Sequence, residues 1–493
     1  MRRAALADGG DVLATGGAAQ AGPARGESQM VVRLALRTLL AHPLRTVVLA
    51  AGFGLGVAVM AILLGVGRVV LEQARAPELV GGGDVVVTGV TGEVVAARAA
   101  LAGVLKTPPL DAWTRVASPS SRATLYLIDE NGATPISARG GIPSRERAIG
   151  DPEVLRQPWD DSTADVAWIE PSADDLLRSI DRFHPIPDVP ARADSWAEWL
   201  YFNGRADGTK FYLTFLVGPR RASEPEGRRV AGVRLQLDRA GRTESFDATA
   251  RVDDETVARA PELDVGPNRI RVADSRYRIA LDLRDRSGRR ATGEVTLEAS
   301  VGRLLPPMEI VGAAGWRTGY VVPVMSGVLG GALEIDGERI ALDGGTGYHD
   351  HNWGFWAGVS WQWGQVQHGD VSFVFGRIFP PRDAADPERM PGFVGAVGPE
   401  GPLGYATTVV ISEMNDAAGR PRQVTVQGRG AAFELTLTLD VADIVVNRMP
   451  GGPLATGLDF LQLRGGYEVR GRIGDRPVAF SAPGAAETFR GTR

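Results

Sequence analysis

Apolar and polar residues alternate with period two along much of the chain from about residue 195 to its end. Tyr277–Leu283 and Val295–Ala299 have this alternation on either side of a Gly-containing turn, which predicts a β-hairpin. Leu333–Ile335 and Ile340–Leu342, joined by an Asp-Gly pair, predict a second hairpin. Many short strands separated by Gly and Asp turns favour antiparallel barrels or sandwiches. Pro306-Pro307 is the expected joint between two such units.

The part of the chain before these strands has a mixed pattern. Val85–Val87 and Thr124–Ile128 predict short strands, and Glu93–Lys106 predicts a helix. Ser172 and Asp175 have the spacing of a capping box, which predicts a helix that begins there. This part is therefore expected to form a small α/β segment and a helix in front of the β units.

One segment near the N-terminus is long and apolar enough to span a membrane. Thr46–Gly67 contains 22 residues and no charge, which is roughly 33 Å of helix. Arg33, Arg37 and Arg45 precede it without an intervening acid, so the N-terminus is expected in the cytoplasm. A cleaved signal peptide is the competing interpretation, but the leader is long and no small-x-small site follows the apolar core. We expect a single-pass anchor in the cytoplasmic membrane, with the C-terminal domains outside the cytoplasm.

The amino-acid composition excludes several kinds of site and partner. The chain has no cysteine, which excludes disulfides, zinc–thiolate sites and cysteine nucleophiles. Acidic residues (59) outnumber basic ones (54), and no basic stripe is visible, so a nucleic-acid partner is not expected.

The candidate catalytic and ligand-binding residues are concentrated in residues 345–354 and in the tryptophans that follow them. If Tyr348–Asn352 is a strand, His349 and His351 face one side and the other three side chains face the opposite side. Burial among indoles should raise the pKa of Asp350, as a general acid requires, and indole faces stabilise a carbocation. The candidate catalytic residues are Asp350, His349, His351 and Tyr348; the candidate ligand-binding residues are Asn352, Trp353, Trp356, Trp361, Trp363, Glu198, Trp199 and Tyr201.

Other interpretations of these residues stay open. The His-Asp-His-Asn run is also compatible with a structural polar network, and the tryptophans with simple filling of a barrel. A metal site would use His349 and His351 with His368 as third ligand, but no metal or other cofactor is expected. Glu198 also fits an ordinary buried acid that pairs with an arginine such as Arg205.

Three motifs resemble one protein family. GTGYHDHNWG (345–354) resembles the signature of the carotenoid 1,2-hydratase (hydroxyneurosporene synthase, CrtC) and AttH-like family. Residues 197–219 are similar to its first-barrel motif, with Leu200 in place of a usual tryptophan, and 486–491 are similar to its C-terminal ending. The resemblance implies two tandem lipocalin-like barrels, apolar polyene substrates, and Asp350 as proton donor. AttH-like members accompany ABC-exporter components, so the resemblance also implies a partner of that kind.

A second resemblance concerns the N-terminal part. Residues 32–64 resemble the first transmembrane segment of FtsX/MacB-type ABC permeases, and 81–89 are similar to the strand that opens their extracytoplasmic domain. The later transmembrane helices of such permeases have no counterpart, so this chain alone cannot form a transport path.

Together these patterns predict a mainly β protein with two lipocalin-like barrels. The expected parts are a disordered tail (1–30), an amphipathic turn and transmembrane helix (31–80), a small extracytoplasmic α/β segment (81–165), a first barrel (166–304) and a second barrel (305–493). The favoured function is binding of a long apolar isoprenoid or lipid beside an ABC-type permease and ATPase. The alternative is a hydratase that adds water across a C=C bond with Asp350 as acid.

The predicted orientation has a direct test. A reporter enzyme fused after Arg493 should be active outside the cytoplasm, because the arginines before the apolar segment hold the N-terminus inside. Reporter activity in the cytoplasm would reverse the topology.

Overall fold

The computed structural model describes residues 110–129, 132–151, 159–169 and 171–491, with breaks at 222–223, 226, 301–302, 400, 407, 431 and 449–457, and isolated positions before 110. The predicted tail (1–30) and apolar segment (46–67) lie outside the described residues, as does nearly all of the predicted helix 93–106. No helix within the described ranges is both long and apolar enough to cross a membrane. The chain divides into units 1–80 and 81–493, and the description below concerns the second.

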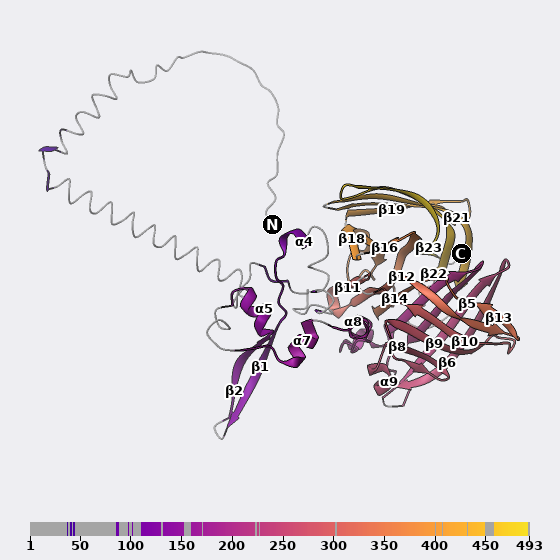
Figure 1. Ribbon diagram of the computed structural model, residues 1–493, viewed down its shortest axis with the longest axis horizontal. Helices are drawn as coiled ribbons and strands as arrows, with labels where there is room; N and C mark the ends of the chain where they lie inside the picture. The colour runs from indigo at the N-terminus through magenta and orange to yellow at the C-terminus, as the bar shows by residue number, and fades with distance from the viewer. Residues whose placement is uncertain are drawn as a thin grey trace, which may run out of the picture. The chain divides into compact units, whose positions relative to one another are not determined.

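Eight strands of the first sheet form a closed ring (Figure 1). They pair in the order β10-β12-β14-β3-β4-β5-β6-β9, and β9 pairs with β10 to close the barrel. These strands are β3 (Trp196–Ala206), β4 (Thr209–Val217), β5 (Arg228–Arg239), β6 (Arg242–Asp253), β9 (Arg276–Arg284), β10 (Arg290–Glu298), β12 (Arg317–Ile335) and β14 (Thr346–Phe355). Four short strands extend the sheet: β7 (Asp264–Val265), β8 (Asn268–Ala273), β11 (Leu305–Val311) and β13 (Glu338–Ala341).

The second sheet has nine strands and is nearly closed. Their order is β18-β17-β16-β15-β23-β22-β21-β20-β19. They are β15 (Ser360–His368), β16 (Val371–Phe379), β17 (Phe393–Gly398), β18 (Gly401–Ala406), β19 (Thr408–Asn415), β20 (Pro421–Gly430), β21 (Phe433–Arg448), β22 (Leu458–Ile473) and β23 (Arg476–Gly491). The mainly β fold with two barrel-like sheets is thus confirmed.

Both predicted hairpins are confirmed, but the predicted joint between the two barrels is misplaced. β9 and β10 pair as the first predicted hairpin, and β12 and β13 as the second, with Asp336 and Gly337 at φ 52° and 83° in its turn. Pro306-Pro307, however, lies inside β11, and β12 and β14 belong to the first barrel. The chain therefore passes from the first sheet to the second between Phe355 and Ser360, beyond the expected joint, because β12 continues the barrel that β10 leaves incomplete.

Short helices and one separate hairpin precede the barrels. β1 (Ser120–Asp129) pairs with β2 (Gly132–Gly141) and includes the predicted strand 124–128, whereas Val85–Val87 is exposed and has no regular structure, so that strand prediction is wrong. The helices are α4 (Leu110–Trp113), α5 (Pro143–Ala148), α7 (Thr163–Ile169), α8 (Ala173–Ile180) and α9 (Asp254–Ala258). As predicted, Ser172 caps α8: its Oγ accepts a hydrogen bond from the Asp175 N–H.

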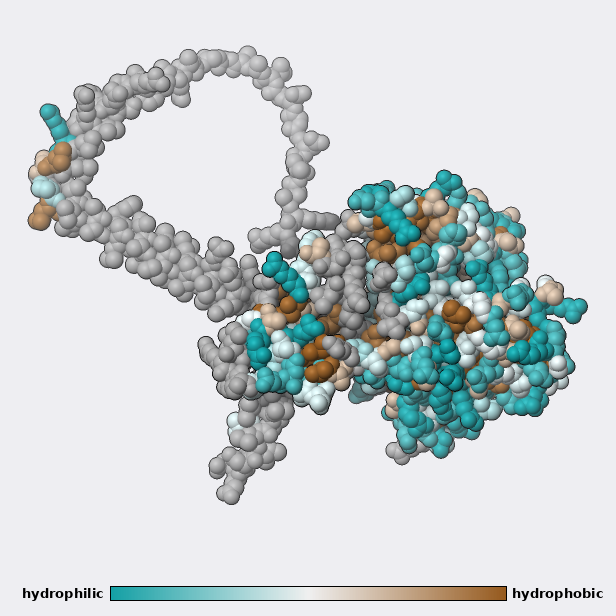
Figure 2. Space-filling view, viewed as in Figure 1, coloured by the Kyte–Doolittle hydropathy of each residue, from teal (hydrophilic) through white to brown (hydrophobic). Residues whose placement is uncertain are grey.

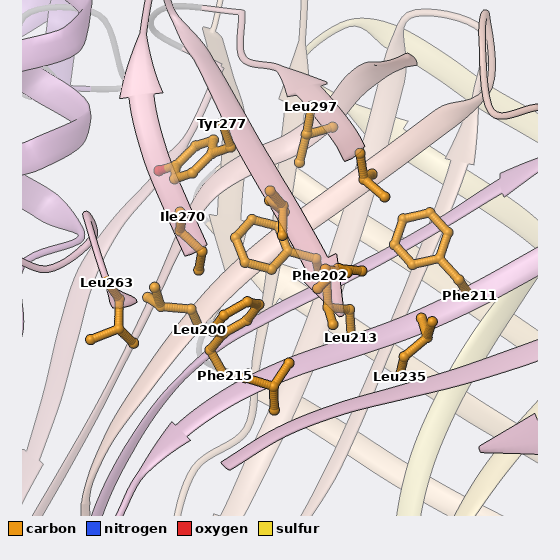
Figure 3. Close-up of a cluster of buried hydrophobic side chains, with 14 of the residues drawn as sticks. Leu200, Phe202, Phe211, Leu213, Phe215, Leu235, Leu263, Ile270, Tyr277 and Leu297 are labelled. Carbon is orange, nitrogen blue, oxygen red and sulfur yellow. The ribbon is translucent and has the colours of Figure 1, made fainter. Parts of the chain in front are cut away.

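Side chains fill the interior of the first barrel. Alternate residues of β4, including Phe211 and Phe215, point inward and meet Leu200 and Phe202 from β3 (Figure 3). The face of this barrel that points to the viewer is largely hydrophilic (lower right, Figure 2), which fits the inward-apolar, outward-polar alternation. The barrel interior is therefore a packed core, and β3 is buried on its outer face too.

The two sheets pack against each other through that outer face. Gln236 donates to Gln462 at 3.1 Å, and Arg464 lies 2.6 Å from Asp238. Further toward β14, Gln365 donates to Asn203 at 3.1 Å. We call the contact zone between β3, β4, β12 and β14 on one side and β15 and β23 on the other the inter-barrel layer.

Candidate functional site

Strand β14 carries the predicted chemistry on two opposite faces. His349 points into the first barrel, where its ring stacks on Phe202 with centroids 4.0 Å apart. Asp350 points into the inter-barrel layer, opposite Tyr201 in the register with β3. The predicted separation, with His349 and His351 on one face and Tyr348, Asp350 and Asn352 on the other, is confirmed.

On the barrel side, two carboxylates and three histidines form what we call the histidine cluster: Asp181, His184, Glu198, His349 and His351. Asp181 Oδ2 accepts from the Tyr277 hydroxyl and lies 2.9 Å from His349 Nε2. His351 lies between the two acids, with Nδ1 3.1 Å from Asp181 Oδ1 and Nε2 2.9 Å from Glu198 Oε1. Glu198 also accepts from the His184 N–H at 3.0 Å. The cluster ties the segment after α8 to β3 and β14.

Opposite charges satisfy this cluster. Burial opposes ionisation of Asp181, but His349 and His351 outweigh it and lower the pKa of Asp181 to about 2. Burial likewise opposes ionisation of Glu198, yet His184 and His351 lower its pKa. Burial alone would lower the pKa of His351, but Asp181 and Glu198 raise it to about 9. Asp181, Glu198 and His351 are therefore ionised at neutral pH.

The metal alternative takes a different form from the one the sequence suggested. His368 stacks on Phe480 in the second sheet and does not converge with His349 and His351. Among the described residues, the donor atoms of His184, Glu198 and His351 lie within 4.8 Å of one another and are the group that could hold a metal ion. In the structure, hydrogen bonds between these same atoms already satisfy them.

Glu198 does not pair with Arg205, which is exposed. The two residues lie an odd number of positions apart on β3, so their side chains leave opposite faces of the strand. The expected arginine pairing is wrong, and histidines take its place.

On the layer side, the carboxyl group of Asp350 is held by neutral donors. Tyr348 Oη donates to Oδ2 at 2.9 Å, and Asn352 Nδ2 donates to Oδ1 at 2.8 Å. The Tyr348 hydroxyl lies 2.7 Å from that of Tyr320, which accepts from Trp363 Nε1 at 2.9 Å. We call these five residues the acid cluster.

Burial controls the ionisation of the acid cluster. Asp350 is only 3% exposed, and burial, reinforced by the charge of Glu487, raises its pKa well above the ordinary range despite the hydrogen bonds from Tyr348 and Asn352. Burial also raises the pKa of both tyrosines, which remain donors. Burial therefore favours the neutral, protonated form of the Asp350 carboxyl group.

A second, half-buried carboxyl group enters the layer from β23. Glu487 accepts from Trp361 Nε1 at 3.0 Å and lies opposite Trp363 in the register with β15. Burial raises its pKa to about 7, against the hydrogen bond from Trp361. The layer therefore holds two carboxyl groups with raised pKa values, on facing sheets.

The predicted aromatic residues are divided between the clusters. Trp353 stacks on His184 with centroids 4.1 Å apart, so it belongs to the histidine cluster. Trp199 packs against Trp356, with centroids 4.5 Å apart, and near Trp361 at 6.3 Å, at the end of the layer beyond Asn352. Trp361 and Trp363 contact the acids directly or through Tyr320.

A hollow opens at the other end of the layer. Its volume is about 60 Å³, room for a few water molecules, and Asn203, Arg205, Lys210, Tyr212, Thr346 and Gln365 are among its lining residues. Asp350 does not line it, but Tyr201 and Asn203 connect the two places along β3. Tyr201 Oη and Asn203 Nδ2 are buried and have no hydrogen-bond partner among the described residues.

Three functional candidates were not predicted. Asp181 and Tyr320 are brought in from segments distant in sequence and carry no recognisable motif. Glu487 lies within the C-terminal ending already noted for its family resemblance, which was the one available signal.

Comparisons with known proteins give only distant structural similarity. No family profile matches the chain, and no curated protein matches it in sequence. A putative AttH from Nitrosomonas europaea is 15% identical over 63% of this chain and 97% of its own, with a TM-score of 0.39. Kievitone hydratase from Nectria haematococca is 14% identical over 64% of this chain and 95% of its own, with a TM-score of 0.40. CghA is 14% identical over 63% of this chain and 94% of its own, also with a TM-score of 0.40. At these values the likeness carries no conclusion about chemistry.

The histidine cluster should make stability fall with rising pH. Because the pKa of His351 is raised to about 9 from 6.5, its contribution is complete below pH 6.5 and is lost as pH rises through 9. Between pH 6.5 and 9 we expect the free energy of unfolding to decline by up to about 3 kcal/mol, and His351→Gln to flatten that decline. Urea unfolding at several pH values measures it.

His368→Gln is the matched control, since that ring lies in the second sheet. It should keep the wild-type slope. An unchanged slope in His351→Gln would show that the cluster does not store this energy.

Proposed function

We propose that the inter-barrel layer is an active site in which Asp350 protonates a carbon–carbon double bond of an apolar substrate and water completes a hydration. One observation carries this proposal. Asp350 is buried without an arginine or lysine partner among the described residues, and its oxygens are held by neutral groups, Tyr348 and Asn352. A carboxyl group kept neutral at pH 7 is what a general acid requires.

The surrounding residues suit each step. The Asp350 proton goes to one alkene carbon, and the cation that forms on the other lies near the indole faces of Trp361 and Trp363. Water forms the new C–O bond and gives its proton to a carboxylate, for which Glu487 is placed. An alkene and one water thus give an alcohol, with the proton returned to the protein.

A carrier role alone explains these residues less well. An apolar ligand needs only apolar walls, whereas placing carboxyl groups in the layer costs desolvation free energy, and this layer holds two, Asp350 and Glu487. The resemblance of 345–354 to the hydratase and AttH-like motif supports the same role for Asp350. We therefore favour catalysis over the pure binding function that the sequence first suggested, with a long apolar isoprenoid or lipid as ligand in either case.

Location and partners remain proposals from sequence. The uncharged segment 46–67 supports anchoring in the cytoplasmic membrane, and the permease resemblance of 32–64 supports work beside an ABC-type exporter. Both would place the barrels where an apolar substrate can be taken from the bilayer.

Asp350→Asn should abolish hydration and spare binding. The amide keeps the shape and accepts from Tyr348, but it has no acidic proton, so we expect kcat to fall about 10²- to 10⁴-fold. The full chain is incubated with an acyclic carotenoid and, separately, with a polyunsaturated fatty acid, and mass spectrometry detects the gain of one water.

Asp207→Asn, in the exposed β3–β4 turn, is the control and should turn over normally. Full turnover by Asp350→Asn, or no water adduct from either substrate with the wild type, would count against acid catalysis and leave the carrier function.

Glu487 should determine the acid limb of the pH profile. With a pKa of about 7, it becomes able to accept a proton only as pH rises through that value, so kcat should rise through pH 7 and fall again when Asp350 ionises. Glu487→Gln should lower kcat and remove the rise near pH 7. A rise that persists in this variant would assign the limb to another group.

A further inference from the structure

We propose that the hollow at the end of the inter-barrel layer binds the carboxylate headgroup of an unsaturated amphiphile. The substrate class is then a polyunsaturated acid of the fatty-acid type rather than a pure hydrocarbon. This inference rests on the proposed function, because it assigns the substrate of the same layer.

Two cations at the hollow have no anion. Arg205 and Lys210 line it and lie directly opposite each other in the register of β3 and β4. Like charges in such a pair destabilise a sheet. Neither has a carboxylate partner among the described residues; Asp238, opposite Lys210 on β5, is engaged by Arg464 at 2.6 Å and by Thr243 at 2.8 Å. An oxyanion between the two cations would relieve the repulsion.

A buried donor in the same hollow has no acceptor. Asn203 is 7% exposed, and its Oδ1 accepts from Gln365, whose own Oε1 faces Gln367 Nε2 at 3.4 Å. This chain of amides fixes the orientation of Asn203. Its Nδ2 has the Tyr201 hydroxyl as a polar neighbour but makes no hydrogen bond of normal geometry within the described residues. A buried donor left unsatisfied costs about 1–3 kcal/mol, and a ligand oxygen in the hollow would satisfy it.

The volume of the hollow and the direction of β3 limit which ligand can bind. About 60 Å³ accepts a small oxyanion but not a hydrocarbon chain, so the chain must extend elsewhere. The residues that follow Arg205 on the same face of β3 are Asn203 and Tyr201, opposite Tyr348 and Asp350. Tyr201, Tyr320 and Trp361 are only partly buried.

The register of β3 with β14 also sets the distance between a carboxylate bound in the hollow and Asp350. Each step of two residues along a strand spans about 7 Å. A carboxylate held between the levels of Arg205 and Asn203 therefore places Asp350 about 7–14 Å along the chain of the ligand. The double bond that gains water should lie at that distance from the acid group.

The test compares a conjugated polyene fatty acid, parinaric acid, with its methyl ester, which has the same chain and no charge. Energy transfer from the tryptophans of the layer to the polyene reports binding to the full chain. We expect the wild type to bind the acid at least tenfold more tightly than the ester. The Arg205→Met/Lys210→Met double variant and Asn203→Asp should lose that preference and keep ester affinity.

Arg242→Met removes an exposed cation at the β5–β6 turn and should behave as the wild type. Dodecyl phosphate and dodecanoate as competitors distinguish a phosphate from a carboxylate site: stronger competition by the phosphate would overturn the carboxylate assignment. Equal affinity of the wild type for acid and ester, or equal weakening of both in the variants, would overturn the headgroup site itself.

Binding and turnover separate this inference from the proposed chemistry. Asp350→Asn should bind the acid as tightly as the wild type, because its charge-neutral change lies outside the hollow. If the headgroup site is wrong but hydration is right, the double variant will hydrate acid and ester at the wild-type rate. If hydration is wrong, the preference for the acid will persist without any product.

Discussion

Burial of strand β14 on both faces is the constraint on which the rest of this structure depends. A strand with one solvated face leaves half its polar side chains to water, but β14 lies between β3 and β12 in the barrel and against the second sheet outside it. Every hydrogen-bonding group from Tyr348 to Asn352 must then be satisfied by protein. The polar side chains that lie near it, from α8 to β23, follow from that requirement.

The two faces meet the requirement in opposite ways. On the inner face, His351 lies between Asp181 and Glu198, so charge balances charge and the acids stay ionised. On the outer face, Asp350 accepts hydrogen bonds from one phenol and one amide, and the nearby Glu487 raises its pKa further. Asp181 and Asp350 both lie near His351, yet their pKa values shift in opposite directions because their environments differ. Ion pairs hold the inner face together, whereas the outer face favours a protonated carboxyl group.

Sequence reasoning predicts what is local and misses what is distant. The alternation of 348–352 was enough to place the histidines and Asp350 on opposite faces, and burial among tryptophans was enough to expect a raised pKa for Asp350. The same parity argument, applied to β3, would have excluded the pairing of Glu198 with Arg205. Asp181 and Glu487 could not be placed, because contacts across more than a hundred residues leave no period in the sequence. Pro306-Pro307 suggested a joint, but strand pairing across β12 decides where the barrel ends.

The packing of the first barrel also explains where a ligand can go. A barrel of eight strands is just wide enough for its own side chains, and the phenylalanines and leucines of β3 and β4 occupy that space. The open volume lies on the outer face of β3, which the second sheet covers incompletely. Among the described residues, Arg205 and Lys210 have no carboxylate partner there, and Asn203 Nδ2 has no acceptor. The hollow, Asp350 and an aromatic end follow one another along the outer face of β3 and β14, and Glu487 lies on the facing sheet. This order is the one that the proposed substrate, an elongated molecule with an anionic end, requires.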